Sequence, residues 1–405
     1  MVKFSQHLLV TLALVLAWVA TIVMAFWALG AVWFRFPFSL GPIFASCGLV
    51  ALIMLYGTLQ KKTLWLAYVA GAVTSIWLVL QLQQPSHDRI WADDQSELSR
   101  VYFDEDQVTI TNFRHSEYRS ESDFDVHRSD FTFDLTQLDQ VWFLVQHFTP
   151  QEGLAHVMLA FEVKPPAGPP EHFAISVEIR RELDEAYSPI AGLYREYELN
   201  YVFGDERDLI GVRTVMRPDD RVFMYPVNAT PDQVQRLFNS ISKRANQIGR
   251  RPEFYHTVLN NCMNGILRHT DKLTSEEINW FDPQILMPGY SDHYAFQNDL
   301  IGRPGQSFEA LKKRCRIDER ARDFGISEGF SQVIRDFGPE TIEEPMEEQP
   351  QVAVAKPKKL VAKKPVTKKP KPKKPKRRKP VTKKPKPKPE PVVPEEEEPN
   401  PIIAI

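Results

Sequence analysis

Cys262 is one of three cysteines in the chain and lies in the stretch FYHTVLNNCMNGILRH, between His256 and His269. A cysteine acts as a nucleophile when a base accepts its proton and its surroundings stabilise the thiolate. The residues around Cys262 predict that it begins a helix, where free backbone N–H groups favour negative charge. His269 would share a face of this helix but would lie about 10 Å away, too far for a direct hydrogen bond. His256 could fold back from the preceding loop, although the spacing does not require it.

Two other interpretations of Cys262 stay open. If this part of the chain lies outside the cytoplasm, conditions are oxidising and a disulfide with Cys315 is compatible with them. Cys47 lies within an apolar segment and cannot reach a globular domain. Cys262 could also be an inert buried thiol. His156 begins the apolar stretch HVMLAFEV and is the better candidate for a base, although a histidine in this position is often structural.

Composition divides the chain of 405 residues into three regions, which we take as residues 1–85, 86–338 and 339–405. The formal net charge of −2 conceals a basic tail, because 18 Lys and Arg residues but only 5 Asp and Glu residues follow residue 350. A basic tail indicates an anionic partner, which could be the acidic body itself. There is no paired-cysteine spacing, no His-Glu-x-x-His motif and no phosphate-loop or dinucleotide glycine pattern. We therefore expect no metal, no cofactor and no nucleic-acid partner.

The first region contains three uncharged apolar segments, at Leu8–Phe34, Phe38–Leu59 and Leu64–Leu82. Roughly 20 apolar residues suffice to cross a bilayer as a helix, so the sequence predicts three transmembrane helices. Lys3 and the pair Lys61-Lys62 are expected on the cytoplasmic side by the positive-inside rule. Three crossings would deliver the rest of the chain to the far side, which is the periplasm for a bacterial inner membrane. The link that follows is short and holds the next domain close to the bilayer.

The second region alternates strand patterns with a few helical ones. Strands are predicted at Gln107–Phe113, Val141–Phe148, His156–Val163, His172–Ile179 and Arg221–Val227. Thr230-Pro231-Asp232-Gln233 has the signature of a helix start, and apolar residues at helical spacing continue to Gly249. Together these elements predict an α+β domain with a mostly antiparallel sheet.

Several longer segments of this region resemble the bacterial family of Lnb N-terminal periplasmic domains, which is named after a lipoprotein N-acyltransferase. These segments occur in the family's order, and three membrane spans before the domain are also familiar for it. They are Val108–Phe124, Leu154–Val163, Ala174–Glu182, Tyr187–Thr214, Pro252–Cys262 and Met287–Phe296. The resemblance implies a permuted papain-like fold, similar to NlpC-type and lecithin:retinol acyltransferase-type enzymes, in which the histidine strand precedes the cysteine helix.

The resemblance also implies roles for particular residues. Cys262 would be the nucleophile and His156 the general base. The orienting group would come from the neighbouring strand, where Ser176 and Glu178 share a face, and we favour Glu178 because a carboxylate stabilises the imidazolium. Ser176 is then expected to line the site. Three further residues are possible site-lining groups, with Tyr255 and Asn261 as potential oxyanion donors and Arg207 as either a site residue or part of an ion-pair network.

We therefore expect a cysteine acyltransferase or acyl hydrolase, anchored in the inner membrane, that acts on lipid or lipoprotein acyl groups through an acyl-enzyme. The alternatives are a cell-wall peptidase or amidase and a non-catalytic envelope scaffold. The third region repeats Lys-Pro dipeptides and cannot bury a core, so it is expected to be disordered and extended. This tail could contact cell wall or anionic lipid, or serve only as a solvated spacer.

Overall fold

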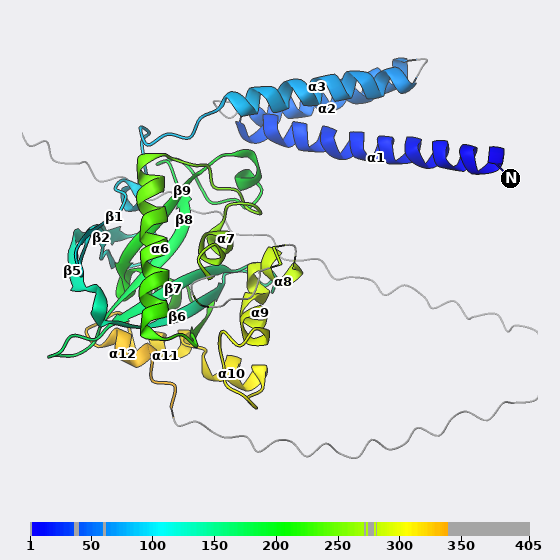
Figure 1. Cartoon of the computed structure of the whole chain (residues 1–405). Helices are drawn as coiled ribbons and strands as arrows, with labels where there is room; N and C mark the ends of the chain where they lie inside the picture. The colour runs from blue at the N-terminus through cyan, green and yellow to red at the C-terminus, as the bar shows by residue number, and fades with distance from the viewer. Residues whose placement is uncertain are drawn as a thin grey trace, which may run out of the picture. The chain divides into compact units, whose positions relative to one another are not determined.

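The computed structural model describes residues 2–35, 40–59, 62–270, 273, 279–280 and 282–338. The prediction for the tail, residues 339–405, therefore lies outside the described residues. The N-terminal part forms three helices, α1 (Val2–Arg35), α2 (Gly41–Thr58) and α3 (Lys62–Leu82) (Figure 1). They pack through a small apolar cluster that includes Ala28 of α1 and Trp65 and Val69 of α3.

Two of these helices, over Thr11–Arg35 and Leu64–Leu82, are long and apolar enough to cross a membrane. The expectation of three spans is not confirmed. Within the described residues, the apolar helical part of α2 extends only from Gly41 to Tyr56, which is shorter than the roughly 20 residues that a span requires.

The following domain is built on one large, eight-stranded sheet (Figure 1). Its strand order is β1-β2-β9-β8-β7-β6-β10, with β5 also paired to β2, and only the β2–β9 pair is parallel. A separate hairpin joins β3 (Glu117–Tyr118) to β4 (Phe124–Asp125). The strands of the main sheet are β1 (Arg100–Asp104), β2 (Gln107–Arg114), β5 (Arg128–Asp134), β6 (Leu138–His147), β7 (His156–Val163), β8 (Glu171–Arg180), β9 (Glu198–Asp205) and β10 (Arg221–Pro226).

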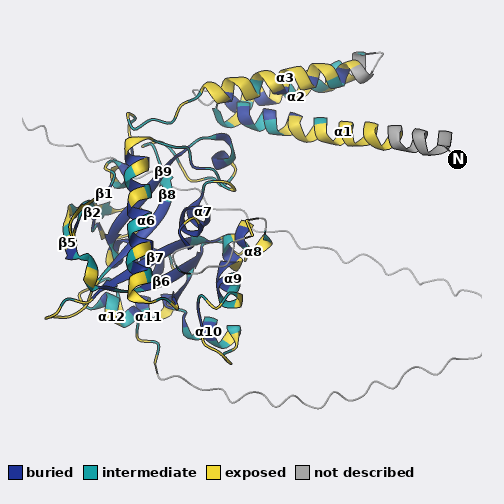
Figure 2. Cartoon of the chain, viewed as in Figure 1, coloured by how far each residue is buried: buried dark blue, intermediate teal, exposed yellow. Residues whose placement is uncertain are grey.

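Helices cover both faces of this sheet. The larger core lies on the face of α6 (Pro231–Arg250) and α7 (Cys262–Leu267), which appear buried in Figure 2 where they meet the strands. The smaller core lies on the other face, under α4 (Glu206–Leu209), α11 (Asp318–Phe324) and α12 (Phe330–Ile334). The remaining helices are α5 (Gly211–Thr214), α8 (Pro283–Leu286), α9 (Ser291–Gln297) and α10 (Phe308–Arg314).

The predicted elements of this domain are confirmed. The strand predicted at 156–163 is β7 residue for residue, and the others agree within a few residues. Helix α6 begins with the expected capping box between Thr230 and Gln233, and it ends at Arg250 rather than at Gly249. The α+β class and the mostly antiparallel sheet follow from these elements, whereas a papain-like arrangement is not established by them.

Candidate active site

Cys262 is the first residue of α7, as the sequence predicted. Asn261 caps this helix, because its side-chain oxygen accepts a hydrogen bond from the Asn264 amide at 2.9 Å and the Asn264 side chain bonds back to the Asn261 amide. Gly265 lets the helix lie close to the sheet, since a Cβ atom there would come within 2.8 Å of the Val177 side chain. Sequence and packing together therefore hold the thiol against the sheet.

The thiol is not part of a disulfide. Cys262 and Cys315 are both buried free cysteines, so the alternative of a bridge between them is wrong. Burial raises the pKa of Cys262 to about 11, although the backbone amides of Val157, Met263 and Cys262 itself act to lower it. These amides offset only part of the effect of burial, so the thiol is protonated at neutral pH because it has lost its hydration.

His156, Ser176 and Glu178 form a connected chain on β7 and β8. The Nε2 atom of His156 lies 2.7 Å from the Ser176 hydroxyl oxygen. The Ser176 hydroxyl in turn donates a hydrogen bond to the Glu178 carboxylate. With the carboxylate as final acceptor, Nε2–H of His156 must donate to Ser176, which leaves Nδ1 unprotonated and able to accept a proton.

Glu178 is held as an anion by arginine. Burial would raise its pKa, but Arg213, Arg114 and His156 outweigh burial and lower the pKa well below the usual range of a glutamate. Arg213 contacts the carboxylate at 2.5 Å, and Gln95 also donates to it. The prediction chose a carboxylate behind the histidine; the structure has Ser176 in direct contact with the ring and Glu178 one hydrogen bond further away.

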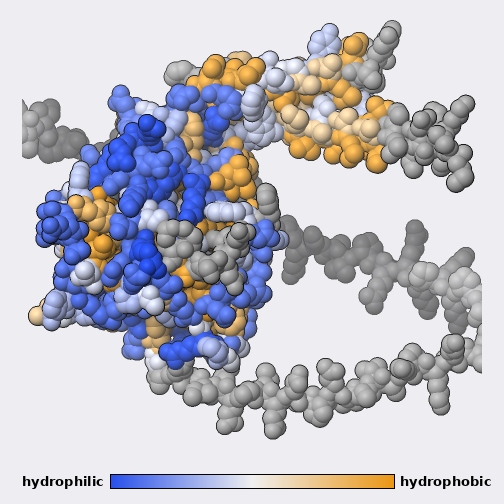
Figure 3. All heavy atoms as spheres, viewed as in Figure 1, coloured by the Kyte–Doolittle hydropathy of each residue, from blue (hydrophilic) through white to orange (hydrophobic). Residues whose placement is uncertain are grey.

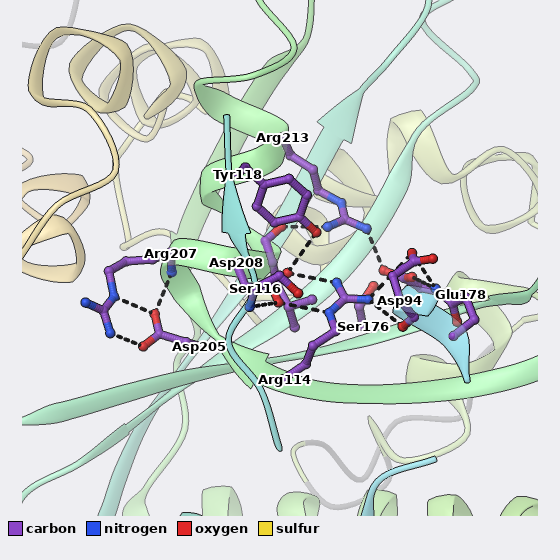
Figure 4. A network of polar contacts seen from close by, with 12 residues as sticks. Asp94, Arg114, Ser116, Tyr118, Ser176, Glu178, Asp205, Arg207, Asp208 and Arg213 are labelled. Carbon is purple, nitrogen blue, oxygen red and sulfur yellow. Dashed lines mark hydrogen bonds and ion pairs between the residues drawn. The ribbon is translucent and has the colours of Figure 1, made fainter. Parts of the chain in front are cut away.

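A buried ion-pair network continues from Glu178 (Figure 4). Arg114 donates two hydrogen bonds of 2.9 Å to the Asp208 carboxylate, and both side chains are almost inaccessible to solvent. Tyr118 also donates to Asp208. The arginines and carboxylates of β2, β8, α4 and α5 therefore form buried charge pairs on the face that carries His156.

Burial, with a smaller contribution from nearby Arg213, lowers the pKa of His156 to about 3. The imidazole is therefore neutral across the physiological pH range, which suits a general base but excludes a resting imidazolium. A neutral imidazole beside a protonated thiol differs from the ion pair of strongly activated cysteines.

The thiol and the imidazole approach the same strand end from opposite faces of the sheet. Side chains alternate along β7, so Val157 enters the core under α7, whereas His156 lies on the face of Ser176. The last pair between β7 and β8 is Met158 with Ser176, and the Cys262 sulfur lies beside the Val157 amide just beyond this pair. Among the described residues no hydrogen bond joins the sulfur to the His156 ring.

Of the other predicted site residues, some lie near Cys262 and one does not. Tyr255 lies close to Cys262 and shares a hydrogen bond with Tyr187, and burial raises its pKa well above the usual value. The Asn261 amide is occupied, since its nitrogen donates to the Thr257 carbonyl and its oxygen caps α7. Arg207 is half-exposed and pairs with Asp205, away from Glu178 in Figure 4.

The two histidines nearest to Cys262 in sequence have other roles. His256 accepts hydrogen bonds from the Val258 and Leu259 amides and shapes a turn. His269 lies 2.8 Å from the Ser240 hydroxyl on α6. Neither ring is directed at the thiol by these contacts, which leaves His156 as the histidine of the site.

Sequence reasoning missed Arg213, Gln95 and Tyr187. Arg213 neutralises Glu178 from α5, a helix of only four residues that has no recognisable periodicity. Gln95 lies before the first strand and reaches Glu178 only through the tertiary fold. Tyr187 stood at the start of a family-like segment, and this was the one signal that could have drawn attention to it.

Comparison with known proteins assigns the core of this domain to a family. Residues 127–288 match the family model of the Lnb N-terminal periplasmic domain, a range that includes His156, Ser176, Glu178 and Cys262. No curated protein and no solved structure matches the chain. The family's periplasmic domain and the apolar N-terminal helices describe a membrane-anchored protein with a periplasmic domain. The segment 127–288 therefore belongs to the Lnb N-terminal periplasmic domain family.

Proposed function

We propose that this protein is a cysteine-dependent acyltransferase or acyl hydrolase that acts on lipid or lipoprotein acyl groups at the membrane surface. The observation that carries the proposal is the pairing of two half-sites at one strand end. The Val157 amide is among the groups that lower the pKa of Cys262, and His156, the residue before Val157, is held by Ser176 in the tautomer that leaves Nδ1 free.

The proposed first step forms a thioester. As the sulfur attacks the acyl carbonyl, its proton passes to Nδ1 of His156, and the amides of Val157, Met263 and Cys262 stabilise the developing negative charge. The imidazolium then returns the proton to the leaving oxygen of the donor. Because the resting thiol has a pKa of about 11 and the ring one of about 3, proton transfer accompanies attack and does not precede it.

In the second step an amine or water attacks the thioester, and His156 accepts its proton and returns it to the sulfur. Ser176 and Glu178 hold the ring through both steps. Glu178 stabilises the imidazolium at a distance of one hydroxyl group, and Arg213 keeps Glu178 ionised. The gap between Nδ1 and the sulfur must close in the substrate complex while Nε2 keeps its bond to Ser176, since catalytic hydrogen bonds often close only when substrate is bound.

The fold and topology belong to the same proposal. A helix with the nucleophile at its start, packed on a sheet whose histidine strand precedes it in sequence, supports a permuted papain-like arrangement. Arg35 at the end of α1 pairs with Glu196, and Leu80 near the end of α3 accepts a hydrogen bond from Arg195. The C-terminal ends of α1 and α3 thus both lie at the domain, so the two helices would cross the membrane in the same direction. The chain must then return across the membrane between them, which supports α2 as a third crossing in the inner membrane. Contact of the basic tail with wall polymer or anionic lipid stays a prediction.

The test is to trap and weigh an acyl adduct on Cys262 in the full chain incubated with phospholipid. We expect an adduct that is absent in Cys262→Ser and His156→Ala but present in Cys315→Ser, since Cys315 is an equally buried free thiol far along the chain. Release of new termini from cell-wall fragments, with no acyl adduct, would favour the peptidase alternative. A thiol probe that fails to label Cys262 in the folded chain would favour the scaffold.

A further inference from the structure

Six large apolar side chains on the loops near Cys262 are exposed to solvent. We call them the apolar rim, and their exposed fractions lie between 40% and 75%. The apolar rim consists of Ile90, Leu183, Tyr187, Ile190, Val258 and Leu259. In the view of Figure 3 the domain surface is mostly hydrophilic, with a few apolar patches. Single exposed apolar residues need no explanation, but a set gathered on adjoining loops marks an interaction surface.

Hydrogen bonds join the loops that carry the apolar rim. The Leu183 amide donates to the Ile90 carbonyl, which couples the first two members. Thr257 binds the loop of Ile190, because its hydroxyl donates to the Pro189 carbonyl at 2.6 Å and its amide donates to Gly192. The backbone is therefore tied in a shape that leaves these side chains pointing outward.

The apolar rim is adjacent to the proposed nucleophile. Tyr187 shares a hydrogen bond with Tyr255, and both tyrosines interact electrostatically with Cys262. Val258 and Leu259 form the turn that leads directly into α7, whose first residue is Cys262. A partner that binds the apolar rim would therefore lie next to the Cys262 thiol.

The apolar rim is also continuous with the ends of the candidate membrane spans. Ile90 follows Leu82, the last residue of α3, by about eight residues, which reach at most about 30 Å when extended. Tyr194, in the same loop as Ile190, packs against Ala31 of α1 and Leu80 of α3. Arg195 of this loop donates to the Leu80 carbonyl at 3.0 Å. Because the candidate membrane spans end next to the apolar rim, the bilayer is the partner that lies closest to this surface.

We propose that the apolar rim inserts into the headgroup and upper acyl region of the membrane in which the protein is anchored, so that Cys262 faces the lipid surface. The proposal rests on the proposed function for its purpose, which is direct access of a lipid acyl carbonyl to the thiol. The surface is of the interfacial kind, with exposed aliphatic and aromatic side chains at the water–lipid boundary.

The experiment uses the full chain in vesicles of phosphatidylethanolamine and phosphatidylglycerol. Benzoylphenylalanine is incorporated in place of Leu259, Ile190 or, as a control, Phe324, an exposed apolar side chain on α11 that lies beyond the other face of the sheet. We expect light-induced cross-links to lipid acyl chains at positions 259 and 190 and none at 324. Equal lipid cross-linking at 259 and 324, or cross-links only to protein, would overturn the proposal.

A second pair of variants separates this surface from the chemistry. Leu259→Glu and Ile190→Glu should label with a thiol probe at Cys262 as well as the natural chain does, but lose the acyl adduct formed from vesicles. Lipid cross-links without any acyl adduct in the natural chain would support the surface and contradict the proposed function. An acyl adduct in the natural chain that is undiminished in both glutamate variants would overturn the surface and leave the function standing.

Discussion

The two faces of the central sheet are stabilised by different physical means. Under α6, aromatic side chains pack edge-to-face around Phe238, with Phe133 and Phe161 each within 6 Å of it, and no charge is involved. On the face of His156, arginines are buried with carboxylates, as in Arg114–Asp208 and Arg213–Glu178. The site lies where these faces meet, with an apolar surrounding for the thiol and a charged one for the imidazole.

This difference has a chemical consequence. Burial, with a smaller contribution from the Glu178 charge, keeps Cys262 protonated, whereas burial among arginines keeps His156 neutral and Glu178 ionised. The thiol therefore keeps its proton and the imidazole stays neutral, which are their states before proton transfer. A structural ion-pair network can therefore also set the protonation state of a candidate catalytic residue.

The largest effect should come from breaking the buried charge pair. Asp208→Ala leaves the buried Arg114 with only its longer pair to Asp94 at 3.8 Å, and we expect the free energy of unfolding to fall by about 3–5 kcal/mol. Urea unfolding of the full chain measures it. The matched control is Arg207→Ala, which breaks the exposed pair with Asp205 and should cost at most about 1 kcal/mol. Equal losses in the two variants would contradict the distinction between buried and exposed pairs.

A loss of similar size is expected on the apolar face for another reason. Phe238→Ala removes a fully buried ring and leaves a cavity, which should lower the free energy of unfolding by about 3–5 kcal/mol. The loss should not depend on salt, since no charge is affected. Phe324→Ala, at an exposed position, is the control and should stay within about 0.5 kcal/mol of the natural chain. A strong salt dependence for Phe238→Ala would mean that the faces are not independent.

A smaller effect, on the rate of acyl-adduct formation, is expected from a change at Ser176 in the candidate site. Ser176→Ala removes the hydroxyl between His156 and Glu178, and we expect acyl-adduct formation on Cys262 to slow by about tenfold or more, the value of one hydrogen bond. The rate is followed by mass spectrometry. Ser242→Ala is the control, because Ser242 is equally buried on α6. An unchanged rate in Ser176→Ala would show that another group orients the ring.

The smallest effect concerns a carboxyl in the loop that bears the apolar rim. Burial raises the pKa of Glu185 to about 7, above the ordinary glutamate value of about 4.5. The folded chain therefore binds this proton more tightly than the unfolded chain, and stability falls as the pH rises from about 4.5 to about 7. Glu185→Gln should flatten this part of the stability profile, as measured by urea midpoints. Glu171→Gln, at an exposed position, should leave the profile parallel to that of the natural chain.

The predictable part of the fold rested on short-range patterns. The alternation of HVMLAFEV predicted β7, and the Thr230-Pro231 signature predicted the start of α6. The position of Cys262 at the start of α7 followed from the asparagines that flank it. The extent of α2 was not predictable in the same way, because apolar composition does not tell where a helix begins.

The candidate site was likewise predictable only where local sequence patterns determine the structure. The alternation of side chains determined by sequence alone that Ser176 and Glu178 share a face, since this requires only the period of a strand, whereas the register between β7 and β8 decided that His156 lies on the same face. Tertiary structure decided that Ser176 touches the ring, that Arg213 holds Glu178, and that Cys262 and Cys315 stay free thiols. These outcomes depend on strand register and on helices that approach from distant parts of the chain. Local periodicity determines which way a side chain points, but only long-range packing determines what it meets.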